Sequence, residues 1–180
     1  MRYKKLACFD FDDTLFYTPN PQEGKKIWFD KTGENWKHIG WWGKSETLDT
    51  NIFDIPLNKW VHDKYINLTN DKETFVIVAT GRLEKIKGMR DNIDKIFNKN
   101  GLQFDEVHLN TGSDTLNFKL KLFEQKIETL GVEEFIIFDD RQEHLPEFEK
   151  WADNQNIKIT IVDVVNKTEK TFLEKNKYNI

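Results

Sequence analysis

The stretch Phe9-Asp10-Phe11-Asp12-Asp13-Thr14-Leu15-Phe16 decides how the rest of the chain is interpreted. It follows residues 4–8, which turn apolar at Leu6-Ala7-Cys8, a pattern typical of a buried parallel strand. Three carboxylates then fall within four positions, where their repulsion is costly unless a cation lies between them. Alternation puts Asp10 and Asp12 on one side of the extended segment, so the pattern predicts a site for a hard divalent cation. The alternative is a solvated acidic turn after an edge strand.

The composition favours one ordered, acidic domain over residues 1–180. The chain is long enough for a full core, and its aromatic content of 13% argues against disorder. A net charge of −4 argues against a broadly basic, unspecific nucleic-acid-binding surface, although it leaves room for a local basic groove. The single cysteine, Cys8, excludes an internal disulfide, and we expect no disulfide-linked partner. Without a visible signal peptide or membrane-spanning run, we expect a cytoplasmic protein that does not bind membranes.

Strand and helix patterns alternate along the rest of the chain. Apolar runs predict further strands at residues 74–79, 104–109, 135–138 and 157–162. Helical spacing predicts helices at residues 56–70, 83–98, 114–130 and 143–154. This alternation predicts an α/β fold, a Rossmann-like three-layer α/β/α sandwich around a five-stranded parallel sheet. The tail, residues 163–180, shows no pattern that assigns it to an element.

Residues 17–55 are interpreted as a small aromatic-rich insertion. Residues 22–55 show no clean period, so we expect an irregular segment with room for a short hairpin. Four of the six tryptophans lie here, at positions 28, 36, 41 and 42. Trp36, Trp41 and Trp42 are either platforms for base stacking or the aromatic core of the insertion, and the sequence leaves both readings open.

Polar groups follow three of the predicted strands, and in a parallel sheet these groups meet at one edge. At that edge Mg²⁺ would be held by the Asp10 carboxylate, a backbone carbonyl at Asp12, and Asp139 or Asp140. Asp10 is the candidate nucleophile, and Asp12 is the candidate general acid and base, a role for which we expect a raised pKa.

Further groups are candidates for holding a phosphate ester. Thr80 is expected to bond a phosphoryl oxygen, and Lys119 is preferred to Lys121 as the fixed cation, because Lys121 points to another helical face. The remaining candidate substrate-binding residues are Thr14, Gly81, Arg82, Arg141 and His144. For Arg82 and Arg141 the alternative is an ion pair with a local carboxylate. For Thr14 the alternative is a role in holding its own loop. For His144 a supporting role is favoured over contact with the leaving group.

The motifs DFDDT (10–14), ATGR (79–82), Lys119 and FDDR (138–141) resemble the haloacid-dehalogenase (HAD) superfamily of phosphohydrolases. The resemblance implies a Mg²⁺-dependent phosphatase working through an aspartyl phosphate. It also implies that Asp10 is the nucleophile and Asp12 the general acid and base. Thr80 and Lys119 would bind phosphate, and Asp139 or Asp140 would be a metal ligand. Asp13 departs from the pattern, because many members carry glycine there.

A narrower resemblance joins LFYTP (15–19), GWW (40–42) with Ser45 and Leu48, TLNFK (115–119) and FDDRQEHLPEF (138–148). These pieces resemble the branch called Swiss-Army-Knife RNA-repair-like HAD domains, which implies a substrate such as 3′- or 5′-phosphorylated RNA or DNA. The absence of room for a large cap domain agrees with a bulky substrate. The alternatives are a HAD phosphatase for a small metabolite or nucleotide and a receiver-like signalling domain. The receiver is disfavoured, because its phosphoacceptor would follow a mid-chain strand.

Overall fold

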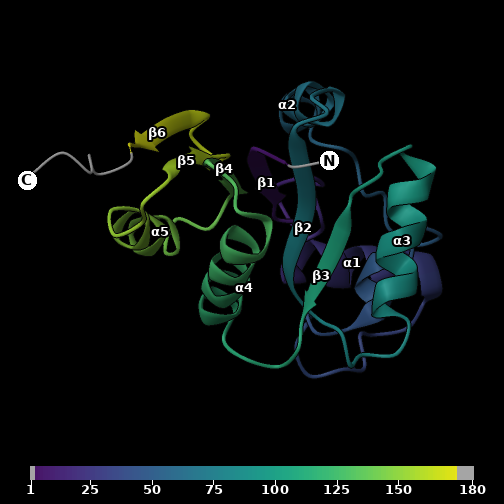
Figure 1. Ribbon diagram of the computed structural model, residues 1–180. Helices are drawn as coiled ribbons and strands as arrows, with labels where there is room; N and C mark the ends of the chain where they lie inside the picture. Colours follow the sequence, from purple (N-terminus) through teal and green to yellow (C-terminus); the bar gives the residue numbers. More distant parts are fainter. Residues whose placement is uncertain (1–2, 174–180) are drawn as a thin grey trace, which may run out of the picture.

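The computed structural model describes residues 3–173, which form six strands and five α-helices with one short 3-10 helix (Figure 1). The five strands and four helices that the sequence patterns predict are all present. In chain order the elements are β1 (Lys5–Phe9), α1 (Pro21–Thr32), η1 (Ser45–Leu48), α2 (Lys59–Asn70), β2 (Thr74–Leu83), α3 (Met89–Lys99), β3 (Glu106–Asn110), α4 (Thr115–Leu130), β4 (Glu134–Asp139), α5 (Leu145–Ala152), β5 (Lys158–Asp163) and β6 (Thr168–Phe172).

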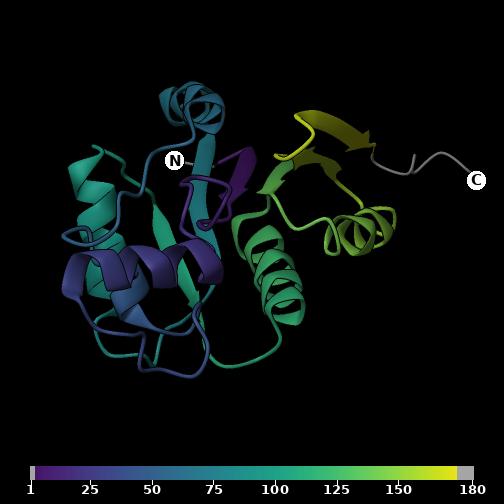
Figure 2. The same ribbon diagram turned by 180° about the vertical axis from the view of Figure 1, so that it is seen from behind.

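The strands form one sheet in the order β3-β2-β1-β4-β5-β6. Strands β1 to β5 are parallel, and β6 pairs antiparallel with β5. Helices α2 and α3 pack on one face and α4 and α5 on the other, with a separate buried apolar cluster beneath each pair (Figures 1 and 2). The predicted three-layer sandwich is therefore confirmed. Among residues 3–173, no helix has the length and apolar character needed to cross a bilayer.

The prediction of a purely parallel five-stranded sheet was wrong at its edge. The chain turns back after β5 through Lys167, whose φ of 55° is left-handed, and adds β6. Four of the five β6 residues are exposed, so neither face of this strand has the apolar alternation that marks a strand in a sequence. Residues 174–180 of the unassigned tail lie outside the described residues.

The helix predicted from Leu83 starts six residues later, at Met89. Strand β2 continues through Leu83 with a register shift between Thr80 and Leu83, and the Glu84 amide still donates to Asn110 O at 2.9 Å. Gly88, at φ 80°, then precedes the helix. These pairings with β3 compete with helix formation, and a left-handed residue cannot continue a helix, so Gly88 marks the boundary before α3.

The prediction that residues 22–55 are irregular was wrong for α1. Asn20 caps this helix by accepting hydrogen bonds from the amides of Gln22 and Glu23 at 3.0 Å, and Pro21 occupies its first turn. That Asn-Pro pair is a helix-start signal in the sequence. The helix escapes detection by periodicity because only Gly24 among its residues is buried. Within the described residues 33–55 no strand forms, so the expected hairpin is absent.

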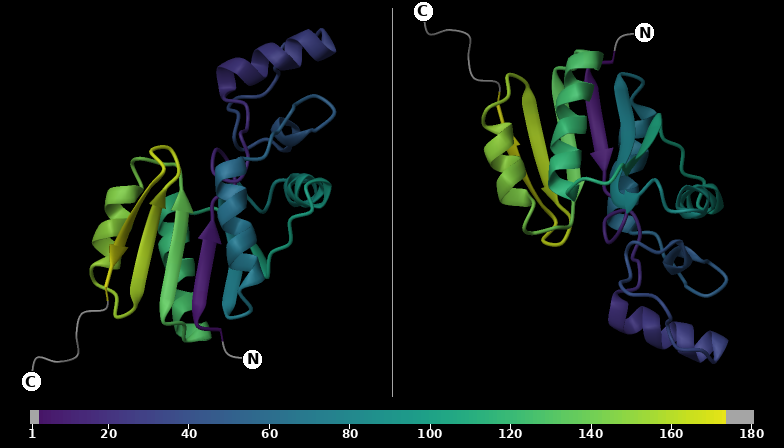
Figure 3. Two further views of the ribbon diagram at one scale, coloured as in Figure 1. Left: turned by 90° about the horizontal axis from the view of Figure 1, so that it is seen from above. Right: turned by 90° about the horizontal axis from the view of Figure 1, so that it is seen from below.

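The insertion packs beyond the carboxyl ends of the strands (Figure 3). Its core is aromatic: Trp41 lies against Gly24, where an added Cβ would come within 2.0 Å of the indole ring. Trp41 also donates its Nε1–H to Pro19 O at 2.8 Å and meets Phe53 edge-on. These contacts join the insertion to the core on the α2–α3 face, so its position relative to the sheet edge is fixed.

Candidate active site

The candidate site lies where the strand order changes direction. Strand β1 pairs with β2 on one side and β4 on the other, with Phe9 opposite Phe138. Asp10 follows β1 directly, Asp139 ends β4, and the Asp10 amide donates to Phe138 O at 3.0 Å. Connections that leave in opposite directions open a crevice at such a point, which is the usual ligand site of this architecture.

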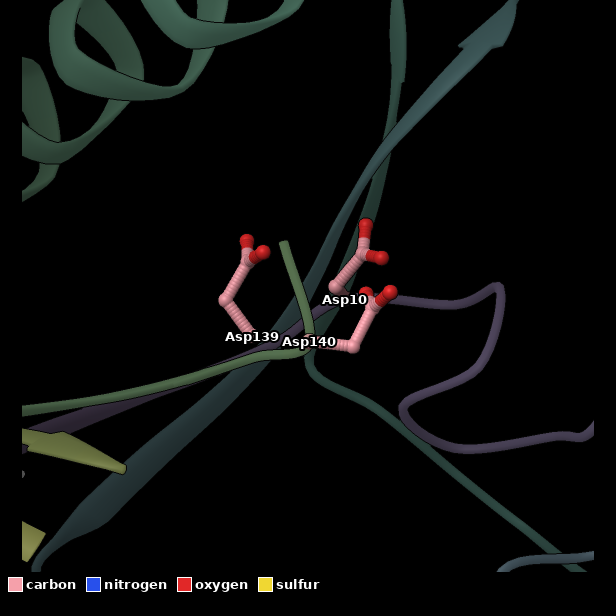
Figure 4. A group of neighbouring side chains, drawn as sticks. All are labelled: Asp10, Asp139 and Asp140. Atoms are coloured by element: carbon pink, nitrogen blue, oxygen red, sulfur yellow. The ribbon is translucent and has the colours of Figure 1, made fainter. Parts of the chain in front are cut away.

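The carboxylates of Asp10, Asp139 and Asp140 converge in this crevice, with ligand oxygens that all lie within 4.8 Å of one another (Figure 4). Thr14 donates its hydroxyl to Asp140 Oδ1 at 3.2 Å, and the Arg141 amide donates to Asp139 Oδ1 at 3.0 Å. The three carboxylates offer only hard oxygen donors. Small shifts of these side chains would bring the oxygens to the distances that a divalent cation needs, so these residues fit Mg²⁺.

Lys119 reaches the same point from α4 and is 1% exposed. Its ammonium group donates to Asp10 Oδ1 at 2.8 Å and to Asp139 Oδ2 at 2.6 Å. Burial by itself lowers the pKa of Lys119, but the two carboxylates outweigh it and raise that pKa above its usual value. Lys121 is exposed on another side of the helix, so of these two lysines only Lys119 meets the acidic cluster.

The cluster carries more negative than positive charge. Three carboxylates and one ammonium group sum to a formal −3 + 1 = −2. Burial, followed by repulsion from Asp10 and Asp139, raises the pKa of Asp140 to about 8. Burial also raises the pKa of Asp10, although Lys119 opposes it. A bound divalent cation balances this charge, which is a second reason why the residues fit Mg²⁺.

The side chain of Asp12 forms an ion pair with Arg82. Arg82 grips the Asp12 carboxylate with two hydrogen bonds, at 2.9 and 2.7 Å, and the Thr18 hydroxyl donates a third at 2.8 Å. Burial raises the pKa of Asp12, but the Arg82 guanidinium outweighs it and holds that pKa below its usual value. The expectation of a raised pKa was wrong, because the ion pair joins residues 70 positions apart that only the folded chain brings together.

Thr80 and Gly81 lie directly before Arg82 in β2, where the pairing with β3 shifts register. Thr80 is fully buried, and its hydroxyl accepts from the Arg82 amide at 3.1 Å. Gly81 lies against α4, where an added Cβ would come within 2.8 Å of the Thr115 hydroxyl. The glycine therefore allows a close approach between the end of β2 and the start of α4.

A cavity of about 620 Å³ opens above the cluster. Six of the residues predicted for the site line it: Asp10, Asp12, Gly81, Arg82, Asp140 and Arg141. The unusual Asp13 lines it as well. Asp13 has a φ of 53°, which explains why a glycine suits this position. Trp42, which the sequence offered as a stacking platform, also lines the cavity. Sequence reasoning missed the other lining residues, which are Gly43, Leu83, Asn110, Ser113, Thr115, Gln142 and Glu143. Asn110 carried a signal, because it ends a strand at the ligand-binding edge.

Five predicted site residues lie behind the lining: Thr14, Thr80, Lys119, Asp139 and His144. Lys119 is hydrogen-bonded to the lining residue Asp10, and Asp139 is connected to the cavity through its bond to Lys119. Thr14 holds Asp140 and does not face the cavity itself, which differs from the expected substrate contact. His144 packs edge-on against Phe148, and its Nδ1 has no hydrogen-bond partner among the described residues.

The chain belongs to the HAD domain family 1 in Swiss Army Knife RNA repair proteins, whose model matches residues 19–177. The match begins after the acidic motif, so the family assignment and the geometry of Asp10 are separate observations. A chain in the solved structure of a Pnkp1/Rnl/Hen1 complex has the same fold, with a TM-score of 0.55 over 89% of this chain at 18% identity. This chain spans only 46% of the length of that one.

Proposed function

We propose that the protein is a Mg²⁺-dependent phosphatase that removes phosphate from nucleic-acid ends. The observation that carries the proposal is the environment of Asp10. Its carboxylate lines an accessible cavity, is bound by a buried ammonium group at 2.8 Å, and shares a cluster with two further carboxylates. A buried, charge-compensated carboxylate at a ligand-binding edge is equipped for nucleophilic attack on phosphorus.

Mg²⁺ would be held by Asp10 and Asp140 and would neutralise charge on the phosphoryl oxygens. Asp139 is the weaker candidate for direct contact, because both of its oxygens are already bonded, to Lys119 and to the Arg141 amide. We therefore assign Asp139 the role of holding Lys119. A backbone carbonyl at Asp12 remains a proposed ligand.

The proposed reaction has two displacements at phosphorus. An Asp10 oxygen forms a bond to phosphorus while the ester bond breaks, and the leaving oxygen takes a proton from Asp12. A water then bonds to phosphorus, gives a proton back to Asp12, and the bond to Asp10 breaks to release phosphate. Lys119 stays protonated beside Asp10 and stabilises the negative charge of both transition states.

The Arg82–Asp12 ion pair favours the second displacement over the first. A deprotonated Asp12 is ready to accept the proton of water, whereas donating one to the leaving group requires the ion pair to loosen. An incoming phosphate is the natural competitor for the guanidinium, because Arg82 also lines the cavity. We propose that substrate binding weakens the hold of Arg82 on Asp12.

The nucleic-acid substrate is proposed from the family and the cavity together. The matched family is described as a domain of RNA repair proteins, and the fold neighbour comes from a Pnkp1/Rnl/Hen1 complex. The insertion contributes only Trp42 and Gly43 to the lining, while the other lining residues come from the sheet edge and its connections. A site that only a small insertion borders on one side has room for the end of a long nucleic-acid strand.

The test compares phosphate release with Mg²⁺ from 3′- and 5′-phosphorylated oligonucleotides and from the matching mononucleotides. We expect one oligonucleotide end to be hydrolysed fastest, Asp10→Asn to be inactive, and the exposed Asp63→Asn in α2 to behave as the native chain. Faster turnover of mononucleotides or simple esters would instead support the small-metabolite reading, which a cavity of about 620 Å³ also accommodates. An active Asp10→Asn protein would contradict the proposed nucleophile.

A further inference from the structure

The tryptophans of the insertion divide into two groups. Trp41 is 3% exposed, and Trp36 packs edge-on or tilted against Trp28 and Trp41, so these three rings build the insertion's own core. Trp42 is 38% exposed and lines the cavity above the acidic cluster. Of the residues suggested for base stacking by the sequence, only Trp42 presents its ring where a ligand can reach it.

Trp42 is held in place by the same arginine that holds Asp12. Arg82 Nη1 donates to the Trp42 backbone carbonyl at 2.7 Å, and the guanidinium carbon lies 5.3 Å from the centre of the indole ring. The same Nη1 donates to the Thr47 hydroxyl at 2.7 Å. The Trp42 ring is exposed, and its backbone is fixed by the arginine that also binds Asp12, the proposed acid and base. Such a ring is organised for contact with substrate.

Two exposed lysines, Lys85 and Lys87, lie in the β2–α3 connection, which begins just after the lining residues Gly81, Arg82 and Leu83. This connection packs against the insertion just after Gly43, because an added Cβ on Gly88 would lie 3.7 Å from the Ser45 hydroxyl and Asn92 donates to Ser45 O. The Lys85 ammonium lies 3.9 Å from the position of a Cβ on Gly112, in the loop whose Asn110 and Ser113 line the cavity.

These two lysines differ from their neighbour Arg90 in having no acidic partner within residues 3–173. Arg90 is paired with Glu84 at 2.6 and 2.9 Å. Lys85 and Lys87 thus leave two uncompensated positive charges in the connection that begins at the cavity lining, in a protein of net charge −4. Unpaired ammonium groups beside an exposed ring are the combination that binds a single-stranded nucleic acid, through its phosphates and its bases.

We propose that Trp42 stacks on the base of the nucleotide that carries the terminal phosphate, and that Lys85 and Lys87 bind the backbone phosphates that follow it. The inference rests on the proposed function and names the surface that selects a nucleic-acid end over a free nucleotide. Stacking on Trp42 contributes to the affinity for any nucleotide, whereas the lysines contribute only when a second phosphate is present.

The test uses three substrates with the same scissile phosphate: ribose phosphate, a mononucleotide, and an oligonucleotide of about eight nucleotides. We expect Trp42→Ala to raise KM about tenfold for the two substrates that contain a base and to leave ribose phosphate unchanged, with Trp42→Phe close to native. The double variant Lys85→Gln/Lys87→Gln should raise KM for the oligonucleotide alone. Its control, Lys95→Gln/Lys99→Gln, removes the same charge from exposed positions later in α3 and should change none of them.

Binding is measured separately, by fluorescence anisotropy of a labelled phosphorylated oligonucleotide on the Asp10→Asn protein. In that background Lys85→Gln/Lys87→Gln should reduce the slope of log affinity against log salt by about 1.4, since each single-strand phosphate contact contributes about 0.7. The inference is overturned if the lysine pair behaves as its control, if Trp42→Ala affects ribose phosphate as strongly as the nucleotides, or if a phosphopeptide binds better than the oligonucleotide. Failure of the phosphatase proposal shows up differently, as no release from any of the three substrates by the native chain, whichever way the anisotropy result falls.

Discussion

Replacing Lys119 with methionine tests the charge balance on which the candidate site depends. Methionine has nearly the length and volume of the lysine stem, so packing in the 1%-exposed position is retained and the ammonium group alone is lost. Asp10 and Asp139 then lose the cation that lies 2.8 and 2.6 Å from their oxygens. The formal charge of the cluster changes from −2 to −3.

Removing one partner of a buried ion pair costs about 3 to 5 kcal/mol, because it leaves an uncompensated buried charge. For a chain of this size that loss corresponds to a fall in Tm of about 6 to 20 °C. The sign of the pH dependence follows from the same charges. Without Lys119 the folded-state pKa of Asp10 rises further, so the variant regains stability as pH falls and this group becomes protonated.

The assay is urea unfolding of the native, Lys119→Met and Lys121→Met proteins at pH 5.5 and pH 8, with and without Mg²⁺. Lys121 is exposed on the same helix, and its replacement should change the free energy of unfolding by less than about 0.5 kcal/mol. Mg²⁺ should recover part of the loss in Lys119→Met, while phosphatase activity should stay absent. A loss below about 1 kcal/mol at pH 8, or an equal loss at both pH values, would refute the view that Lys119 compensates buried charge.

Three further outcomes follow from the geometry. Gly24→Ala should lower stability by about 1 to 3 kcal/mol in thermal unfolding, because its new methyl group overlaps the Trp41 ring; an unchanged Tm would show that the insertion is loosely packed. The pKa of about 8 for Asp140 lies above that of the unfolded chain, so metal-free protein should lose stability as pH rises from 6 to 9. Mg²⁺ should raise the Tm more at pH 9 than at pH 6, and Asp140→Asn should flatten both trends. A Tm at pH 9 that EDTA does not change would argue against a metal site. Arg82→Gln should move the limb of the pH–rate profile that reports Asp12 to higher pH, since the guanidinium no longer lowers that pKa, and an unmoved limb would separate Asp12 from proton transfer.

The parts of the fold that the sequence predicts are those that are buried on both sides. Strands β1, β2, β4 and β5 are flanked by helices and are nearly continuous apolar runs, so their existence and parallel direction follow from composition and spacing. Strand β6 and helix α1 expose most of their residues and therefore carry almost no apolar period. For α1 the informative signal was the cap, Asn20 with Pro21, which depends on backbone hydrogen bonding and not on burial.

The site divides in the same way. Asp10, Asp139 and Lys119 are predicted to meet, because strand ends and helix faces place them at one edge irrespective of side-chain detail. The partner of Asp12 was not predictable, since Arg82 had two plausible acceptors, a substrate phosphate or a carboxylate, and the choice depends on the exact path of the β2–α3 connection. The same connection starts its helix six residues later than the periodicity indicates, which places Lys85 and Lys87 in a loop and not on a helix face.

Arg82 links the two halves of the candidate site in a way that a lysine could not. One guanidinium binds both oxygens of Asp12 through Nε and Nη2, and through Nη1 it binds the Trp42 carbonyl and the Thr47 hydroxyl of the insertion. A single ammonium group has no planar fork that spans these acceptors. The carboxylate proposed to exchange protons and the proposed base platform are therefore positioned by the same side chain. A substrate phosphate that draws Arg82 away from Asp12 would also act on the backbone of Trp42, so binding of the nucleic-acid end and protonation of Asp12 are expected to be coupled.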